Sequence, residues 1–212
     1  MNGDESCPIV IDNGSSMFKI DFAGSETPNF VFPTVVGRGK YDHCMTGYHP
    51  LRCGNDVMSQ LVLLITDYPI KNGCITNWGE MEKIIHYALY EQLKVDPMDH
   101  PILITEAQTD PRINRDKIVE IMFECFNVPS LYFGNQPVLS LYSSGRTSGI
   151  VLDVGDSFTH AVPIFDGYPI SNAASSFNMA GNDLTNWLQK MTKIKKHEVV
   201  RVIKEKFCYV AF

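Results

Sequence analysis

The sequence lacks the features that would direct it to nucleic acid or to a membrane. Its 212 residues include 18 Lys and Arg against 24 Asp and Glu, so the net charge is −6 and no basic excess is available for a phosphate backbone. No stretch reaches the ~18 uninterrupted apolar residues of a membrane-spanning helix, and residues 1–12 have no signal-peptide pattern. We therefore expect a protein of the cytosol or nucleus that neither binds nucleic acid nor inserts into a membrane.

Closely spaced cysteines and low-complexity segments are also missing. The six cysteines include no CxxC pair, and no histidine stands at zinc-finger spacing. We interpret them as reduced thiols rather than as a metal site, which is the alternative. With 44% hydrophobic and 20% charged residues, the composition is typical of a folded protein with a substantial core.

An internal repeat is the most informative feature that is present. Residues 9–19 read IVIDNGSSMFK and align without a gap on residues 150–160, which read IVLDVGDSFTH. Each copy contains an apolar strand, an aspartate, a Gly/Ser turn and a second strand. An ordinary hairpin would explain either copy, but hairpin stability does not require Asp, Gly and Ser at the same offsets twice. We therefore interpret the copies as one functional motif that occurs twice.

Between the copies, the apolar residues alternate between strand and helix periodicity. One helix is predicted from Asn77 to about Leu93. Another is predicted from Asn114 to Phe126, and its inward residues are expected to be Ile118, Ile121, Met122 and Cys125. Strands are expected at residues 102–106, 131–133 and 150–154, with further helices at 138–144, from a cap at Asp183, and at about 198–209. This order predicts an α/β fold with a central parallel sheet and hairpins at its edge.

Chemically useful side chains fall at the ends of these strands, where α/β sheets bind their ligands. Asp12 and Asp153 each end a strand, and Gln136 follows another. Glu106 also ends a strand, but it could equally be a structural hydrogen-bond acceptor and is left out of the site. The two Gly/Ser turns would present N–H groups to an anion, and Lys19 would add a positive charge. Two aspartates in one cleft suit a hydrated Mg²⁺, so the pattern favours a phosphate chain with its cation.

Motifs along the whole chain carry a family resemblance. They include DNGSSMFK at 12–19, TNW at 76–78, ITEA at 104–107, IMFE at 121–124, VLSLY at 138–142, IKEK at 203–206 and CYVA at 208–211. The sequence resembles the actin family, whose fold is shared with heat-shock chaperones and sugar kinases. The resemblance implies an α/β, actin-like ATPase fold with ribonuclease H-like duplicated domains. The first half would span residues 1–136, with the loop 37–53 in its second subdomain, and an incomplete second half would span residues 137–212.

The resemblance also assigns a nucleotide site to matched positions. Asp12 and Asp153 would hold the water shell of Mg²⁺ or Ca²⁺, Gln136 would orient an attacking water, and His160 would relay its proton. The phosphates of ATP or ADP would lie on two loops, made of Gly14, Ser15, Ser16, Met17 and Lys19, and of Gly155, Asp156 and Ser157. The sugar and base would contact Arg201, Lys204 and Glu205.

The implied function is that of an ATP-binding cytoskeletal protein. It would hydrolyse ATP slowly, couple this to filament assembly, and have actin-like subunits and actin-binding proteins as partners. Ser16 and Ser157 replace glycines of actin and Val154 replaces a serine, so a degenerate, non-hydrolysing scaffold is the alternative. A sugar kinase is a third hypothesis, although no sugar site is evident. Because the chain stops soon after residues 208–211, we expect a fragment or a short relative whose open sheet edges need a partner.

Overall fold

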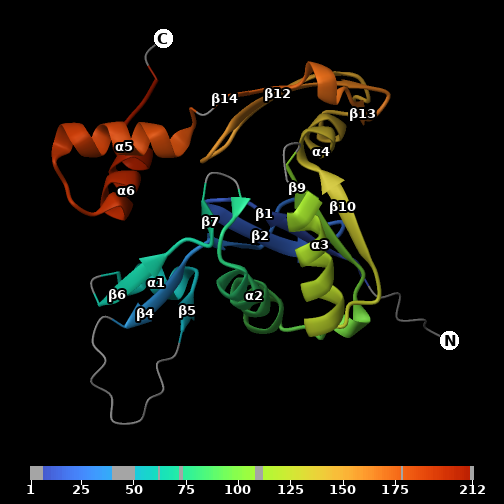
Figure 1. Cartoon of the computed structure of the whole chain (residues 1–212), viewed down its shortest axis with the longest axis horizontal. Coiled ribbons are helices and arrows are strands. Elements are labelled where there is room, and N and C mark those ends of the chain that lie inside the picture. The colour runs from blue at the N-terminus through green and yellow to red at the C-terminus, as the bar shows by residue number, and fades with distance from the viewer. Residues whose placement is uncertain are drawn as a thin grey trace. The chain divides into compact units, whose positions relative to one another are not determined.

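The chain divides into two compact units, Met1–Leu139 and Ser140–Phe212 (Figure 1). The computed structural model describes residues 7–39, 51–61, 63–71, 74–107, 112–177 and 179–210. Most of the predicted exposed loop, residues 40–50, lies outside the described residues. The boundary between the units falls within the helix α4 (Gln136–Ser143).

Unit 1 is built on a five-stranded sheet in the order β10-β9-β1-β2-β3. β1 (Ile9–Asn13), β2 (Met17–Phe22) and β3 (Phe30–Pro33) form an antiparallel meander. β9 (Ile102–Glu106) pairs in parallel with β1, and β10 (Leu131–Asn135) pairs in parallel with β9. The predicted combination of a parallel part and an edge hairpin is therefore confirmed.

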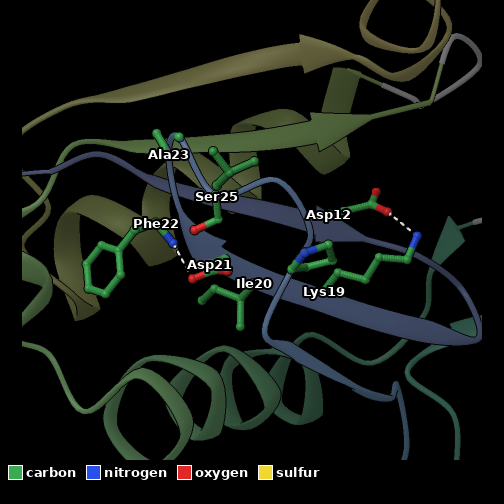
Figure 2. A pocket seen from close by; sticks show the side chains of 10 residues that line it. Asp12, Lys19, Ile20, Asp21, Phe22, Ala23 and Ser25 are labelled. Carbon is green, nitrogen blue, oxygen red and sulfur yellow. Dashed lines mark hydrogen bonds and ion pairs between the residues drawn. The ribbon is translucent and has the colours of Figure 1, made fainter. Parts of the chain in front are cut away.

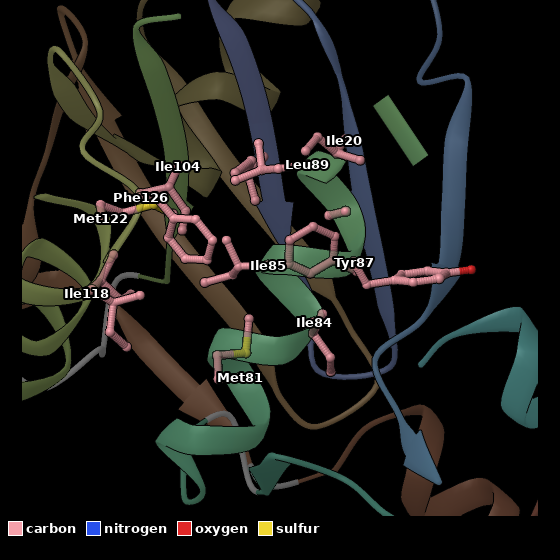
Figure 3. Close-up of a cluster of buried hydrophobic side chains, with 14 of the residues drawn as sticks. Ile20, Met81, Ile84, Ile85, Tyr87, Leu89, Ile104, Ile118, Met122 and Phe126 are labelled. Carbon is pink, nitrogen blue, oxygen red and sulfur yellow. The ribbon is translucent and has the colours of Figure 1, made fainter. Parts of the chain in front are cut away.

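Two long helices supply the core that packs on this sheet. α2 (Trp78–His86) continues as a π-helix, Tyr87–Leu93, and α3 (Arg112–Glu120) continues as a π-helix, Ile121–Cys125. Asn77 caps α2, as predicted, by accepting a hydrogen bond from the N–H of Glu80. Figure 3 shows the buried cluster, in which helix side chains gather around residues of the sheet: Met81, Ile84, Ile85, Leu89, Ile118, Met122 and Phe126 with Ile20 and Ile104.

The structure corrects one predicted inward residue. Cys125 is exposed, whereas Phe126 and Val128 are buried. The helix changes to a π-helix at Ile121, and a π-turn contains one residue more than an α-turn. The inward face therefore advances along the chain, and a prediction based on α-helical spacing selects the wrong residue.

A smaller part of unit 1 follows β3 and precedes α2. It contains a three-stranded sheet, a short helix and a hairpin: β4 (Val36–Gly39), β5 (Arg52–Cys53), α1 (Asn55–Ser59), β6 (Leu64–Asp67), β7 (Ile70–Lys71) and β8 (Cys74–Ile75). Arg38 of β4 forms an ion pair with the buried carboxylate of Glu80 in α2. This ion pair ties the smaller sheet to the helix that covers the main one.

Unit 2 contains a second sheet and two helices. Its strands follow the order β11-β12-β13, with β14 also paired to β12: β11 (Gly149–Val154), β12 (Thr159–Phe165), β13 (Tyr168–Pro169) and β14 (Ser175–Phe177). The helices are α5 (Gly181–Thr192) and α6 (His197–Phe207). Asp183, the predicted cap of α5, lies inside its first turn, and Ala180 is the N-cap residue. The Asp183 carboxylate still stabilises this end, because it accepts a hydrogen bond from the N–H of Ala180.

Within the described residues, none of the helices has the length and apolar character that crossing a bilayer requires.

Candidate functional site

Three polar side chains of unit 1 converge on the carboxylate of Asp12. The ammonium of Lys19 donates to Asp12 Oδ2 at 2.8 Å, and the hydroxyl of Thr105 donates to Asp12 Oδ1 at 2.6 Å. The amide nitrogen of Gln136 lies 3.2 Å from Asp12 Oδ1 and 3.1 Å from Thr105 Oγ1. The structure thus brings three predicted residues, Asp12, Lys19 and Gln136, into one hydrogen-bonded group.

Strand register explains this convergence. Asp12 stands directly opposite Lys19 in the antiparallel pair of β1 and β2. In the parallel pair of β1 and β9, Ile11 stands opposite Ile104, so the next residue of β9, Thr105, lies beside Asp12. Sequence reasoning considered Glu106 and missed Thr105, although the alternation of strand side chains could have identified it. The carboxylate of Glu106 instead pairs with Arg115 at 3.1 Å.

A pocket of about 210 Å³ opens beside this group, and Figure 2 shows Asp12 and Lys19 joined on one side of it. Asp21 also lines the pocket but has a structural role. Burial tends to raise the pKa of the Asp21 carboxyl, but hydrogen bonds from Asn29 and Phe22 outweigh burial and lower the pKa overall. Asp21 therefore fixes the loop after β2, and the candidate site residues of this face lie at the Asp12 end.

The first Gly/Ser turn is held from one side by Thr34. The hydroxyl of Thr34 donates to the carbonyl oxygen of Gly14 at 2.8 Å. The backbone N–H of Thr34 donates to the carbonyl oxygen of Ser16 at 2.9 Å. In a trans peptide the carbonyl and the following N–H point in opposite directions. The N–H groups of Ser15 and Met17 are therefore directed away from Thr34, as anion binding requires.

Position 14 requires glycine because the backbone of Met17 approaches it closely within this turn. A Cβ at this position would lie 2.5 Å from the carbonyl oxygen of Met17, which no real side chain tolerates. Ser16, two residues further on, does not adopt a positive φ, because the described non-glycine residues with positive φ are Lys94, Asn127, Asp166 and Lys193. The same holds for Ser157 in the second turn. The two serines that replace glycines of actin therefore cause no backbone strain.

The second turn is also held through its carbonyls, by backbone N–H groups at the start of α5, although its second tethered residue, Asp156, is the equivalent of Ser15 rather than of Ser16. The carbonyl oxygen of Gly155 accepts from the N–H of Gly181 at 3.1 Å, and that of Asp156 accepts from the N–H of Asn182 at 2.8 Å. These bonds satisfy two N–H groups at the helix N-terminus. By the same peptide geometry, the N–H groups of Asp156 and Ser157 point away from α5. Both copies of the repeat thus have tethered carbonyls and N–H groups on the opposite side.

Charged side chains of α6 lie next to the second turn. The ammonium of Lys204 donates to the carbonyl oxygen of Gly181 at 2.7 Å and so holds the start of α5. Burial raises the pKa of the Asp156 carboxyl, and the positive charges of Lys204 and Arg201 offset only part of this effect. Asp156 is thus a carboxylate whose charge the protein itself does not fully compensate.

The predicted sugar and base contacts sit together on α6. Arg201 is buried, and its Nε lies 3.8 Å from a carboxylate oxygen of Glu198 and 3.7 Å from one of Glu205. The side chain of Glu205 is exposed, in contrast to that of Arg201. Arg201, Lys204 and Glu205 therefore form a continuous polar strip along one helix, starting at the second turn.

The remaining two predicted residues of unit 2 face each other across its hairpin. Asp153 of β11 stands opposite His160 of β12, in the same relationship as Asp12 and Lys19 in unit 1. His160 is buried, and its ring centroid lies 5.5 Å from that of Phe158. In the described part of the chain, no three His, Cys, Asp or Glu side chains are grouped closely enough to hold a metal ion by themselves.

Comparison with known proteins identifies the family. The family model described as Actin matches residues 3–200, which is most of the chain. Together with the mixed α/β architecture, this match shows an actin-like fold. The chain belongs to the actin family, as its sequence motifs predicted.

Proposed function

We propose that this chain is a nucleotide-binding member of the actin family, in which the two Gly/Ser turns bind the phosphates of ATP or ADP. The observation that carries the proposal is that hydrogen bonds hold carbonyl groups of both turns. In each, protein donors tether the carbonyls, so that two N–H groups are directed to the other side. A family with duplicated halves needs two such turns for one phosphate chain, and this chain has one in each copy of its repeat.

Asp12 and Asp153 are the proposed residues for a divalent cation. Carboxylate oxygens are suitable donors for Mg²⁺ or Ca²⁺, and Mg²⁺ keeps much of its water shell in proteins. The cation would supply neutralisation of phosphate charge. Because Asp12 already accepts from Lys19, Thr105 and Gln136, we propose that it contacts water bound to the cation rather than the cation itself.

Slow hydrolysis is assigned to Gln136 and His160. Gln136 has a carboxamide that can orient a water, and its bonds to Asp12 and Thr105 fix the side chain near the first turn. His160 is the proposed proton relay, because an imidazole ring can both accept and donate a proton. Arg201, Lys204 and Glu205 are proposed to contact the sugar and base, and the exposed carboxylate of Glu205 offers acceptors for hydroxyl groups.

At the level of the cell, we propose a cytoplasmic cytoskeletal role. ATP turnover would be coupled to filament assembly with other actin-like subunits, and actin-binding proteins would be partners. The first actin-like half is proposed at residues 1–136, and the hinge helix and the start of the second half at residues 137–212.

A second candidate function is that of a scaffold that binds nucleotide without hydrolysing it. The observation that favours it is that the amide nitrogen of Gln136 is already engaged by Asp12 and Thr105. A side chain held in this way orients water less freely. Val154, which replaces a hydroxyl residue next to the second turn, also removes one donor.

Thermal unfolding with and without Mg-ATP tests nucleotide binding, and phosphate release tests hydrolysis. Nucleotide at a hundred times its dissociation constant should stabilise the chain by about 2.7 kcal/mol. Asp12→Asn should lose this protection, whereas Glu124→Gln, an exposed carboxylate outside the site, should keep it. Protection with slow phosphate release that Gln136→Ala abolishes supports the ATPase. Protection without release supports the scaffold, and absence of protection rejects both.

A further inference from the structure

The hydrogen bonds around Asp12 have a fixed direction. Asp12 is a carboxylate paired with the Lys19 ammonium (Figure 2), so its oxygens can only accept. The hydroxyl of Thr105, 2.6 Å from Asp12 Oδ1, must therefore donate its one proton to that oxygen. The Gln136 atom 3.2 Å from the same oxygen must be the amide nitrogen, because an amide oxygen there would face a carboxylate with no proton between them.

This direction leaves Thr105 only lone pairs for its other neighbour. Gln136 Nε2 lies 3.1 Å from the Thr105 oxygen, and it can donate there because the Thr105 proton is already directed to Asp12. An amide nitrogen carries two hydrogens. Thr105 Oγ1 and Asp12 Oδ1 supply one acceptor for each of them, so both donors of the Gln136 carboxamide are used.

The carboxamide oxygen is the end of Gln136 that stays available. Within the part of the chain that the structure describes, Gln136 Oε1 accepts no hydrogen bond, and it is not among the fully buried atoms that lack a partner. In a planar carboxamide the oxygen and the nitrogen lie on opposite sides of the carbon that joins them. Gln136 therefore presents an acceptor, and not a donor, away from Asp12.

The order of the strands explains why Thr105 can hold this arrangement. β9 lies between β1 and β10 in the sheet, and Gln136 follows directly after β10. Neighbouring strands are about 4.8 Å apart, so the strands that carry Asp12 and lead to Gln136 are separated by about 10 Å. Thr105 stands on the middle strand, one residue beyond the buried Ile104, and so shares a sheet face with Asp12.

The backbone of Gln136 is fixed independently of Thr105. Asn135 Oδ1 accepts from the N–H of Val138 at 3.4 Å, which caps the first turn of α4. Pro137 restricts its own φ and the conformation of the residue before it. The freedom that remains at Gln136 is rotation of its side chain, and this is the freedom that Thr105 restricts.

We propose that Thr105 is a positioning residue that determines which end of the Gln136 carboxamide faces the site. It holds both amide hydrogens toward the Asp12 side and leaves the oxygen as the acceptor for a water molecule. The role of that water rests on the proposed function, in which Gln136 orients water for slow ATP hydrolysis. Thr105 acts there through Gln136 alone.

The reversed carboxamide is the alternative, and it is less favourable. Its oxygen would face Asp12 Oδ1 without a proton between the two atoms. Thr105 would have to turn its hydroxyl proton from Asp12 to Gln136, so the 2.6 Å contact with Asp12 would lose its hydrogen bond. Removing the Thr105 hydroxyl takes away one of the two acceptors that favour the observed orientation, and the carboxamide becomes free to rotate.

The first test is made on the chain without nucleotide. In NMR spectra of the ¹⁵N-glutamine-labelled chain, the side-chain amide signals of Gln136 are identified by their absence from Gln136→Ala. We expect these signals to be rigid and protected from exchange with water. Thr105→Val should make them mobile and speed their exchange by about tenfold. Thr105→Ser, which keeps the hydroxyl, should preserve them, and so should Thr66→Val, at a half-buried threonine of β6.

The second test separates positioning from binding. With Mg-ATP, Thr105→Val should slow phosphate release about tenfold or more and change nucleotide affinity less than about threefold, because the carboxamide is misplaced while the phosphate turns are intact. Thr105→Ser should restore the rate. Thr66→Val should leave both the rate and the affinity unchanged.

Three results would overturn the role of Thr105. They are Gln136 amide signals that Thr105→Val leaves rigid and protected, phosphate release that this substitution does not slow, and a loss of rate that Thr105→Ser does not restore. A parallel loss of rate and affinity in Thr105→Val would also count against positioning. A chain that binds no nucleotide, or binds it without hydrolysis, would reject the proposed ATPase, and the amide measurement would then decide the role of Thr105 alone.

Discussion

The ammonium of Lys19 lies 2.8 Å from a carboxylate oxygen of Asp12, and the two residues stand opposite each other in β1 and β2. Asp153 and His160 stand in the same relationship in β11 and β12. Each copy of the repeat therefore places a carboxylate and a nitrogen-bearing side chain at the base of its Gly/Ser turn. Under the proposed function, the carboxylate would serve the cation and the turn would serve the phosphates.

Replacing Lys19 with methionine should separate binding from stability. Both partners of the Lys19–Asp12 pair are partly exposed, so its loss should change the free energy of unfolding by less than about 1 kcal/mol. A charge-assisted contact to phosphate would be lost as well, weakening nucleotide binding about tenfold or more. Calorimetric titration and denaturant unfolding measure the two effects. Unchanged affinity would remove Lys19 from the site.

Thr34 should act as a positioning residue for the first turn. Thr34 is fully buried, so Thr34→Val leaves the carbonyl of Gly14 without its donor and costs about 1–3 kcal/mol of stability. Nucleotide affinity should fall as well, because the turn loses its tether. Thr34→Ser keeps the hydroxyl and should restore affinity. Thr76→Val removes a similar bond to Pro69 outside the site and should leave affinity intact; a comparable loss there would contradict the assignment.

Asp156 should make stability depend on pH. Its pKa is raised above 3.8 by burial, so the folded state holds the proton to higher pH than the unfolded state does. The contribution of Asp156 to the free energy of unfolding is therefore most favourable below its pKa in the unfolded state. This contribution is lost as pH rises through its higher pKa in the folded state. Asp156→Asn should remove this loss and be the more stable protein at pH 7. Thermal melts from acid to neutral pH measure the difference in stability between the two proteins. A wild type that becomes more stable relative to Asp156→Asn as pH rises would refute the prediction.

The cysteines should differ in reactivity. Burial, followed by the negative charge of Glu91, raises the pKa of the Cys53 thiol to about 12. Cys53 should therefore resist alkylation at neutral pH until the protein unfolds. The exposed thiols of Cys7, Cys74, Cys125 and Cys208 should react in the native state. Mass spectrometry after brief iodoacetamide treatment identifies the modified peptides, and rapid native labelling of Cys53 would contradict the structure.

Much of the fold follows from local sequence patterns. The helix from Asn77 to Leu93 and the strand at 102–106 were predictable, because an N-cap and regular apolar spacing are encoded in adjacent residues. The exposure of Cys125 was not, because the change from α-helix to π-helix depends on packing rather than on local propensity. The exposure of Ile150 and Leu152 was equally hidden, since their pattern is that of a buried strand.

The candidate site was inferred from the sequence where its motif is repeated. The second copy of the motif gave independent weight to Asp12, the first turn and their counterparts. Thr34 and Thr105 were missed because each acts through contacts distant in sequence, to Gly14 and to Asp12. Such contacts become visible only when strand register is known.

The most direct test of the account is the stoichiometry of Mg-ATP binding by the 212-residue chain, measured by isothermal titration calorimetry together with Asp12→Asn and Asp153→Asn. If both turns serve one nucleotide, the chain binds one ATP and each variant weakens that single site. Two independent sites would contradict the account. So would an ATP affinity that one of the two substitutions leaves unchanged.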